Sequence, residues 1–288
     1  MYPADFAYYR ASSVQDAGRL MNEHPGAKFL AGGHSLIPLL KLRLAVPPAL
    51  IDIGRIVDLS GVTVANGRLR IGALTPHAEV AASSDVATHA AALADAAGQI
   101  GDPAVRNRGT VGGNIAHADP ASDLPAVLCA LDASIGIVGA SGDRTVPASE
   151  FFLGMMTTAL GEDEIVTHVE IAAGQQHGSA YAKFPHPASR YAVIGVAAVI
   201  AADGDACRSA AVAVGGLVPA PVRASNVEQA VSGEALTDAS FAKAAQRVGE
   251  DLGDEILGDL FASVEYRRAM APVYVARSLS AAAARARK

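Results

Sequence analysis

The sequence contains two glycine-rich segments, Leu30-Ala-Gly-Gly-His-Ser-Leu36 and Arg108-Gly-Thr-Val-Gly-Gly-Asn114. The first lies between a predicted strand and the start of an apolar predicted helix, where free backbone N–H groups and the positive end of a helix suit a phosphate. Glycine lets a ligand approach the backbone and permits unusual dihedral angles. Either segment alone could be a tight turn or a bulge, but two such segments match the two phosphates of a diphosphate.

The spacing of these glycines argues against two familiar kinds of nucleotide site. Neither segment has the Gly-x-Gly-x-x-Gly pattern of a dinucleotide-binding fold or the pattern of a Walker P-loop. Classical NAD and ATP sites are therefore disfavoured.

Composition narrows the class of protein further. The 288 residues predict about two domains. The chain is 51% hydrophobic and 18% charged, which excludes a disordered or fibrous protein. A net charge of −6 argues against nucleic-acid binding. The longest apolar run, residues 192–202, is shorter than the ~20 residues of a transmembrane segment, and residues 1–5 do not resemble a signal peptide. We expect a cytoplasmic protein, with the inner face of the membrane as an alternative place.

The first half of the chain predicts a mixture of helices and strands. A helix begins after Ser13, and residues 28–53 predict a parallel strand–helix–strand unit with its helix over 35–42. Asn66-Gly67 predicts a two-residue hairpin turn. Further along we expect a helix over 86–100, a glycine-rich loop over 101–114, and strands near 133–138 and 165–171.

The second half predicts a separate α+β domain. Residues 174–178 are the best linker candidate. Three strands are expected over 179–184, 192–202 and 206–214, followed by helices over 238–252 and 264–285, the latter broken or kinked at Pro272.

The chain has two cysteines, Cys129 and Cys207, both in apolar or small surroundings. Two cysteines are too few for a disulfide framework, a zinc site or an iron–sulfur cluster. We expect both to be buried thiols. The sequence also predicts no catalytic residue of its own and no metal ligand.

The two glycine segments, together with Ala118-Asp-Pro-Ala-Ser-Asp-Leu-Pro125, Phe6-Ala-Tyr-Tyr-Arg10 and Glu265-Tyr-Arg-Arg268, resemble the signature of a known family. It comprises the FAD-binding medium subunits of molybdenum hydroxylases, such as the flavoprotein chains of aerobic carbon monoxide dehydrogenase, nicotine dehydrogenase and xanthine dehydrogenase. The resemblance runs essentially from end to end and is strongest to the carbon monoxide dehydrogenase type.

The resemblance implies an α+β fold. A vanillyl-alcohol-oxidase (PCMH)-type FAD-binding domain would cover residues 1–175, in subdomains of about 1–55 and 56–175. A flavoprotein C-terminal domain of three antiparallel strands and helices would cover residues 178–286.

The resemblance also implies an electron-transfer subunit of an oxidoreductase. Its FAD takes electrons from [2Fe-2S] clusters in a small subunit, which a molybdopterin site in a large subunit supplies, and passes them to an external acceptor. A dimer of heterotrimers is expected by analogy. Two alternatives stay open: a stand-alone flavin oxidoreductase of the same fold and a non-catalytic flavin-binding module.

The family's cofactor-binding positions carry over onto this sequence. Two segments would wrap the FAD diphosphate, Gly101 and Asp102 would lie beside the flavin, and four further residues are discussed below. The diphosphate segments comprise Phe29, Leu30, Ala31, Gly32, Gly33, His34, Ser35 and Leu36, and Thr110, Val111, Gly112, Gly113 and Asn114.

Three of these four residues carry a structural alternative beside the implied role. Asp123 would accept hydrogen bonds from the ribose or would cap the next helix. Leu160 would pack against the flavin ring or in the core. Lys183 would place a cation near the cofactor or would be a solvated strand lysine. Tyr191 would stack on the flavin, although residues 185–190 depart from the family's more basic loop.

His34 has two interpretations that the sequence weighs directly. No second histidine or carboxylate stands at ligand spacing from it, so a hydrogen bond within the phosphate-binding segments is favoured over a metal site.

Overall fold

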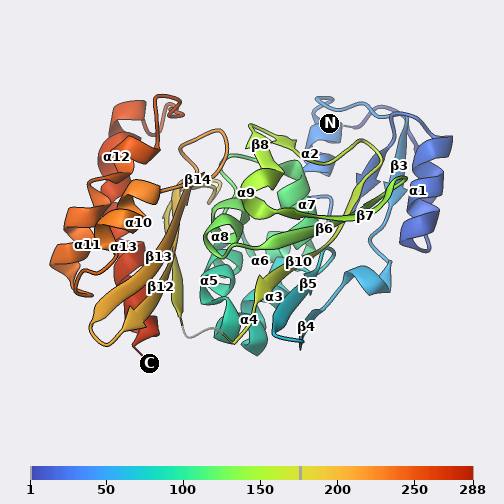
Figure 1. The fold of residues 1–288 in the computed structure, drawn as a ribbon. Coiled ribbons are helices and arrows are strands. Elements are labelled where there is room, and N and C mark those ends of the chain that lie inside the picture. Colours follow the sequence, from blue (N-terminus) through green and yellow to red (C-terminus); the bar gives the residue numbers. More distant parts are fainter. Residues whose placement is uncertain (1, 175–176, 288) are drawn as a thin grey trace.

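The computed structural model describes residues 2–174 and 177–287. These residues form two lobes, with the chain up to β10 (Ile165–Ala172) in the first and the chain from β11 (Gly178–Pro185) onward in the second (Figure 1). The predicted linker at 174–178 joins them, and its residues Gln175 and Gln176 lie outside the described residues.

A parallel sheet of order β1–β3–β2 forms the N-terminal part of the first lobe. The predicted strand–helix–strand unit is confirmed, with β2 and β3 parallel. Strand β1 is not predicted, because its four residues are mostly exposed and only the pairing with β3 defines it. The helix predicted after Ser13 is capped as expected, since Ser13 Oγ accepts the Asp16 N–H at 3.1 Å. The elements are β1 (Ala7–Arg10), α1 (Val14–Glu23), β2 (Lys28–Leu30), α2 (Leu36–Lys41) and β3 (Ala49–Asp52).

An antiparallel sheet of order β4–β5–β10–β6–β7 forms the rest of the first lobe. The predicted hairpin is confirmed: Asn66 and Gly67 have φ angles of 51° and 72°, the left-handed pair that a two-residue hairpin turn needs. Strand β7 is not predicted, since nearly all of its residues are exposed. The elements are η1 (Val57–Leu59), β4 (Val62–Ala65), β5 (Arg68–Gly72), β6 (Ser134–Gly139), β7 (Gly142–Pro147), α9 (Ala148–Phe151), β8 (Phe152–Gly154) and β9 (Thr157–Thr158).

Two predictions for residues 84–117 are wrong in detail. The single helix expected over 86–100 is divided at Ala90, whose ψ of 55° is not helical. The loop expected over 101–114 contains α6 and the first turn of α7, because Asp102 and Thr110 cap these short helices behind the glycines. Helices α5 and α8 contact the sheet of the second lobe. The helices are α3 (His77–Ala82), α4 (Ser84–His89), α5 (Ala91–Gln99), α6 (Pro103–Arg108), α7 (Val111–His117) and α8 (Leu124–Ala130).

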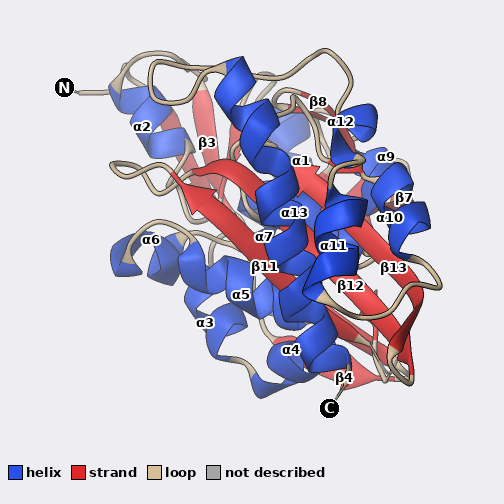
Figure 2. Ribbon diagram, turned by 90° about the vertical axis from the view of Figure 1, so that its left-hand side faces the viewer, coloured by secondary structure: helices blue, strands red, loops and turns tan. Residues whose placement is uncertain are grey.

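The second lobe is an antiparallel sheet of order β11–β12–β13–β14 covered by helices. The three predicted strands are confirmed as β11, β12 and β13, and a fourth strand, β14, is not predicted because its two residues are too few to leave a sequence pattern. The predicted helix over 238–252 is divided into α11 and α12. Helix α13 packs on β11 and β12 (Figure 2) and continues through Pro272, so a break of the helix at this residue, one of the two predicted outcomes, is wrong. The elements are β12 (Ala192–Asp203), β13 (Ala206–Gly215), β14 (Val222–Arg223), α10 (Ser225–Val231), α11 (Asp238–Ala245), α12 (Val248–Asp251) and α13 (Val264–Ala286).

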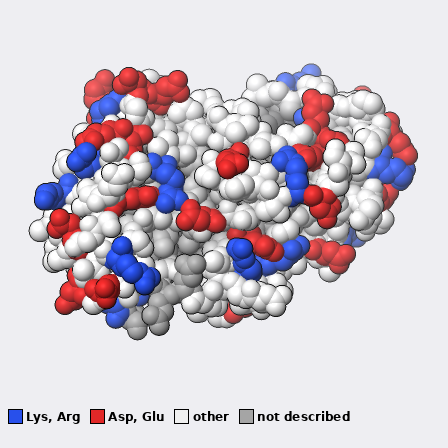
Figure 3. All heavy atoms as spheres, in the orientation of Figure 1, with Lys and Arg blue, Asp and Glu red and all other residues white. Residues whose placement is uncertain are grey.

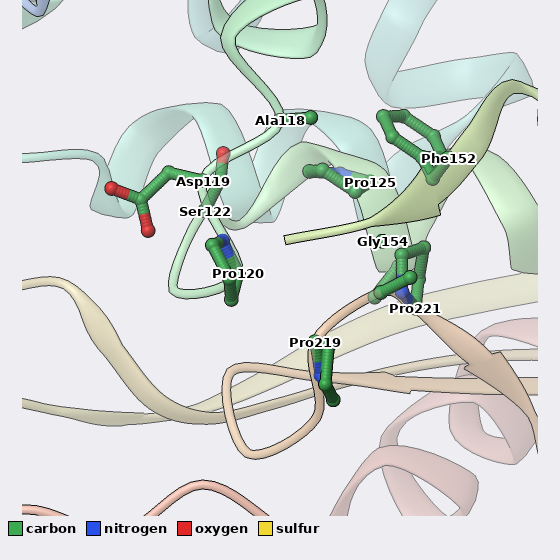
Figure 4. A pocket seen from close by; sticks show the side chains of 12 residues that line it. Ala118, Asp119, Pro120, Ser122, Pro125, Phe152, Gly154, Pro219 and Pro221 are labelled. Carbon is green, nitrogen blue, oxygen red and sulfur yellow. The ribbon is translucent and has the colours of Figure 1, made fainter. Parts of the chain in front are cut away.

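One hydrophobic cluster of the first lobe extends across the junction, since Tyr181, Ala197 and Ala213 of the second sheet belong to it, while the second lobe and the N-terminal sheet each have a further cluster of their own. The backbone also crosses the junction, where Gly216 N–H donates to the carbonyl oxygen of Pro120 at 2.9 Å. Figure 4 shows the proline-lined hollow beside this contact. Its volume of about 10 Å³ holds one water molecule at most, so it is part of the packing and not a ligand site.

Surface charge is sparse, as the composition indicates. On the face shown in Figure 3, much of the surface between scattered acidic and basic side chains is uncharged. Both cysteines are buried as predicted, and burial raises the pKa of Cys129 to about 12. Over the ranges 2–174 and 177–287, we find no helix with the length and apolarity that a membrane span requires.

Candidate functional site

The two glycine segments, far apart in sequence, lie against each other. A side chain on Gly32 would overlap the Arg108 carbonyl oxygen, and its Cβ would lie 2.8 Å from the carbonyl carbon. Gly33 has a φ of 76°, and a Cβ there would lie 2.7 Å from Ile37 Cδ1. The chain's own packing therefore requires both glycines, in addition to any need of a ligand for space.

Four consecutive backbone donors of the second segment, those of residues 111–114, are already used within the protein. The N–H groups of Val111 and Gly112 donate to the carbonyl oxygens of Thr75 and Ala73 at 3.1 and 2.7 Å. The Gly113 N–H donates to Thr110 Oγ1 at 3.1 Å, and the Asn114 N–H donates to the Thr110 carbonyl oxygen at 3.0 Å. The sequence suggests a cluster of free donors in this segment, and that interpretation is wrong for residues 111–114.

The first segment differs in this respect. Among the hydrogen bonds of the described residues, none uses the backbone N–H of any residue from 32 to 36. Five consecutive donors are thus available at the end of β2 and the start of α2. Successive free N–H groups form a concave site that favours an anion.

Both segments line a cavity of about 730 Å³, within the range of cofactor sites in proteins. It lies next to Arg190 and Tyr191 of the second lobe. Most of the expected cofactor-binding residues line it: Phe29, Ala31, Gly32, Gly33, His34, Ser35, Leu36, Gly101, Thr110, Gly112, Gly113, Asn114, Asp123, Leu160 and Tyr191.

Four expected residues are not in the cavity wall, and each has another place. Leu30 completes β2, Val111 is fully buried, and Asp102 Oδ1 caps α6 by accepting the Val105 N–H at 2.8 Å. Lys183 lies behind Asp123. These four residues lie behind the residues that line the cavity.

Asp123 and Lys183 form a buried ion pair between the lobes. Lys183 Nζ lies 2.8 Å from the Asp123 carboxylate, and their side chains are 1% and 5% exposed. Tyr181 Oη donates to Asp123 Oδ1 at 2.6 Å. Burial raises the pKa of Asp123 and lowers the pKa of Lys183, while their mutual attraction opposes both shifts.

These contacts decide two alternatives left open by the sequence. The Asp123 side chain makes no hydrogen bond as a helix cap, so the capping interpretation is wrong. The interpretation of Lys183 as a solvated lysine is wrong as well, since it is buried. Leu160 is half-buried in the cavity wall, and Tyr191 is 45% exposed there. Burial raises the pKa of Tyr191.

Two histidines lie near the glycine segments. His34 Nε2 is 3.2 Å from the carbonyl oxygen of Ala104 in α6, so its hydrogen bond goes to a helix between the segments. His77 lines the cavity, is 2% exposed, and packs on Gly109, where a Cβ would lie 2.9 Å from His77 Cδ2. Burial, with a smaller contribution from His34, lowers the pKa of His77 to about 4.

Sequence reasoning assigned no role to several other wall residues, among them His77, Ser122 and Arg190. Ser122 Oγ donates to Asn114 Oδ1 at 2.6 Å and so fixes the end of the second segment. Arg190 has a φ of 60°, and its charge lowers the pKa of Asp123. Neither His77 nor Arg190 belongs to a sequence motif that points to this cavity, and for His77 the contact is with Gly109, far away in the sequence.

Fold and site together define a flavin-binding oxidoreductase subunit, and the comparison with known families agrees. Residues 4–173 match the FAD binding domain in molybdopterin dehydrogenase, and residues 179–282 match the CO dehydrogenase flavoprotein C-terminal domain. The chain therefore belongs to the FAD-binding subunit family of molybdenum hydroxylases, and FAD is its cofactor. The expected α+β fold is confirmed, apart from the fourth strand.

The chain is similar to two curated relatives at the same level. It is 38% identical over 287 residues to the carbon monoxide dehydrogenase medium chain of Hydrogenophaga pseudoflava, covering 99% of both chains. It is also 38% identical over 273 residues to the glyceraldehyde dehydrogenase medium chain of Sulfolobus acidocaldarius, covering 95% of this chain and 96% of the relative. A solved structure of the Hydrogenophaga carbon monoxide dehydrogenase has a TM-score of 0.94 and 39% identity, with 99% of each chain covered.

Proposed function

We propose that this chain passes electrons from a small subunit that carries [2Fe-2S] clusters, through its FAD, to an external acceptor, while a large molybdopterin subunit oxidises the substrate. FAD supplies the chemistry that this position needs, because it can accept electrons singly and release them in pairs. The protein's part is to bind and orient the cofactor and to set its electrostatic surroundings.

The observation that carries the proposal is the row of five free N–H groups at residues 32–36 in the wall of the large cavity. We assign the FAD diphosphate to these donors. Thr110, Gly112, Gly113 and Asn114 then shape the opposite wall. The N–H groups of Gly112, Gly113 and Asn114 are used internally, whereas the Thr110 N–H takes part in none of the hydrogen bonds of the described residues.

The other wall residues receive complementary roles. Asp123 would accept hydrogen bonds from the ribose, because a carboxylate has acceptors only. Gly101 and Leu160 would contact the flavin, and Tyr191 would cover one of its faces. Domain boundaries of 1–175, with subdomains of about 1–55 and 56–175, and 178–286 agree with this division of the site.

The relatives support a substrate site on another chain. The similarity is the same, 38%, to a medium chain named for carbon monoxide and to one named for glyceraldehyde. The two substrates differ greatly in size and polarity, so we infer that a subunit equally similar to both is not where the substrate is selected.

Exposed apolar side chains beside the cavity give the partner subunits a place to bind. Ile37, Leu42, Leu44 and Val46 are 40%, 54%, 73% and 61% exposed on and after α2. Exposed apolar side chains that gather in one short segment are typical of a permanent interface. We expect the small subunit to cover it, within a dimer of heterotrimers in the cytoplasm, free or at the inner face of the membrane.

The experiment is to follow the visible absorption of the purified chain reconstituted with FAD. We expect the flavin band to bleach only after the cluster-bearing and molybdopterin subunits and their substrate are added. Bleaching of the isolated chain by an organic substrate would support a stand-alone flavin oxidoreductase instead. A flavin that binds but is never reduced in the full complex would support a non-catalytic flavin-binding module.

A further inference from the structure

Tyr181 of the second lobe contacts Asp123 in the cavity wall, and the proposed function does not use this contact. It lies in β11, is 6% exposed, and donates its hydroxyl to Asp123 Oδ1 at 2.6 Å. Lys183 is two positions further along the same strand, and residues two apart on a strand point to the same face. One strand of the second lobe therefore holds one carboxylate of the first with two hydrogen bonds.

The second sheet is built to admit the Tyr181 ring. Gly195 in β12 pairs in register with Lys183, and a Cβ on Gly195 would overlap Tyr181 Oη. That Cβ would also lie 3.0 Å from the ring carbon Cζ. A glycine within a strand often marks such a close approach. The position of the hydroxyl is thus fixed by packing on one side and by Asp123 on the other.

We propose that Tyr181 is a positioning residue for the cofactor: together with Lys183 it fixes the Asp123 carboxylate, ionised, in the wall of the FAD cavity. The second lobe then contributes to FAD affinity through residues that do not themselves line the cavity. This inference rests on the proposed role of Asp123 as a ligand of FAD.

Four groups of the second lobe face Asp123. Tyr181 and Lys183 come from β11, and Arg190 and Tyr191 come from the turn between β11 and β12. Burial raises the pKa of Asp123, whereas Lys183, Tyr181 and Arg190 lower it. Removal of the Tyr181 hydroxyl takes away one of the influences that lower the pKa, so the carboxylate takes up a proton at a higher pH.

The test compares FAD binding by the wild-type chain and by Tyr181→Phe across a range of pH. Flavin fluorescence reports binding, and the chain contains no tryptophan to interfere. We expect the Kd for FAD to rise about tenfold near neutral pH, the effect of one hydrogen bond to a charged group. We also expect affinity to begin its decline with falling pH at a higher pH than in the wild type.

Tyr274→Phe is the matched control. Tyr274 lies in α13 of the same lobe, is 8% exposed, and packs against Phe184 away from Asp123. Loss of its hydroxyl should leave both the Kd and the pH profile unchanged. An equal weakening in both variants would mean that Tyr181 acts only through the general stability of the lobe, and would overturn the inference.

A second measurement does not depend on the cofactor. The carboxyl ¹³C resonance of Asp123, assigned through its loss in Asp123→Asn, is titrated in the FAD-free chain. We expect a higher pKa in Tyr181→Phe than in the wild type. An unchanged pKa, or a raised pKa with an unchanged Kd for FAD, contradicts the positioning role. Failure of the wild-type chain itself to bind FAD would refute the proposed function and this inference with it.

Discussion

Replacement of Lys183 by methionine tests how the buried ion pair between the lobes contributes to stability. Methionine keeps a long unbranched side chain but removes the ammonium group, which lies 2.8 Å from the Asp123 carboxylate. The side chains of the pair are 1% and 5% exposed, so the remaining charge has little access to water. Loss of one partner of a buried pair costs ~3–5 kcal/mol.

The contacts of Asp123 place the expected loss at the lower end of that range. Tyr181 still donates to Asp123 Oδ1 in the variant. We therefore expect a loss of about 3 kcal/mol, which corresponds to a fall in Tm of roughly 6–12 °C for a chain of this size.

The pH dependence has a definite sign. Burial already raises the pKa of Asp123, and removal of Lys183 takes away the strongest opposing influence. The native-state pKa in the variant is then well above the unfolded value, so the native state takes up a proton as the pH falls and regains stability. The difference between Lys183→Met and the wild type should shrink from mildly alkaline to mildly acidic pH.

The assay is thermal unfolding of the FAD-free chain followed by circular dichroism at several pH values. The control is the double variant Lys183→Met with Asp123→Asn, which removes both charges and should recover most of the lost stability. A double variant as unstable as the single one, or a difference that grows as the pH falls, would refute the reasoning.

Three further predictions concern the glycine contact, a helix cap and the thiols. Gly32→Ala should abolish FAD binding in a fluorescence titration, because the added Cβ overlaps the Arg108 carbonyl oxygen. Gly98→Ala is the control, since its Cβ meets only Ala81 Cβ at 3.9 Å; this variant should bind FAD normally and gain ~0.5 kcal/mol of stability in thermal unfolding. Asp102→Ala should lose ~1 kcal/mol of stability with the loss of the α6 cap, while FAD affinity changes little; a large loss of affinity would show that Asp102 contacts the cofactor directly. Cys129 and Cys207 should react with a thiol reagent only after denaturation, because both are buried; rapid labelling of the native chain would contradict their placement.

The site shows where sequence reasoning succeeds and where it stops. Most residues of the two glycine segments line the cavity, because each segment is contiguous and a strand end or helix start carries it there as a unit. Which backbone N–H groups of these segments are free could not be predicted in the same way. Whether a backbone N–H is free depends on its partner, and for Gly112 that partner is the carbonyl of Ala73 in another part of the chain.

The fold shows the same division. Asn66-Gly67 determines its hairpin locally, through the left-handed angles that these two residues accept. Strands β7 and β14 carry no such signal, since they are exposed or very short and exist by pairing with β6 and β13. Long-range pairing of this kind leaves no periodicity in the strand's own residues.

The sequence by itself determined the glycine segments, the order of the two domains, the absence of enough cysteines for a cluster, and the resemblance that implies FAD. The tertiary structure alone decided that residues 32–36 keep their donors free and that Asp123 is held by Tyr181 and Lys183. Local conformational preference depends on a few neighbouring residues and can therefore be predicted from the sequence. Hydrogen-bond partnership, burial and charge state depend on which distant segments the folded chain brings together.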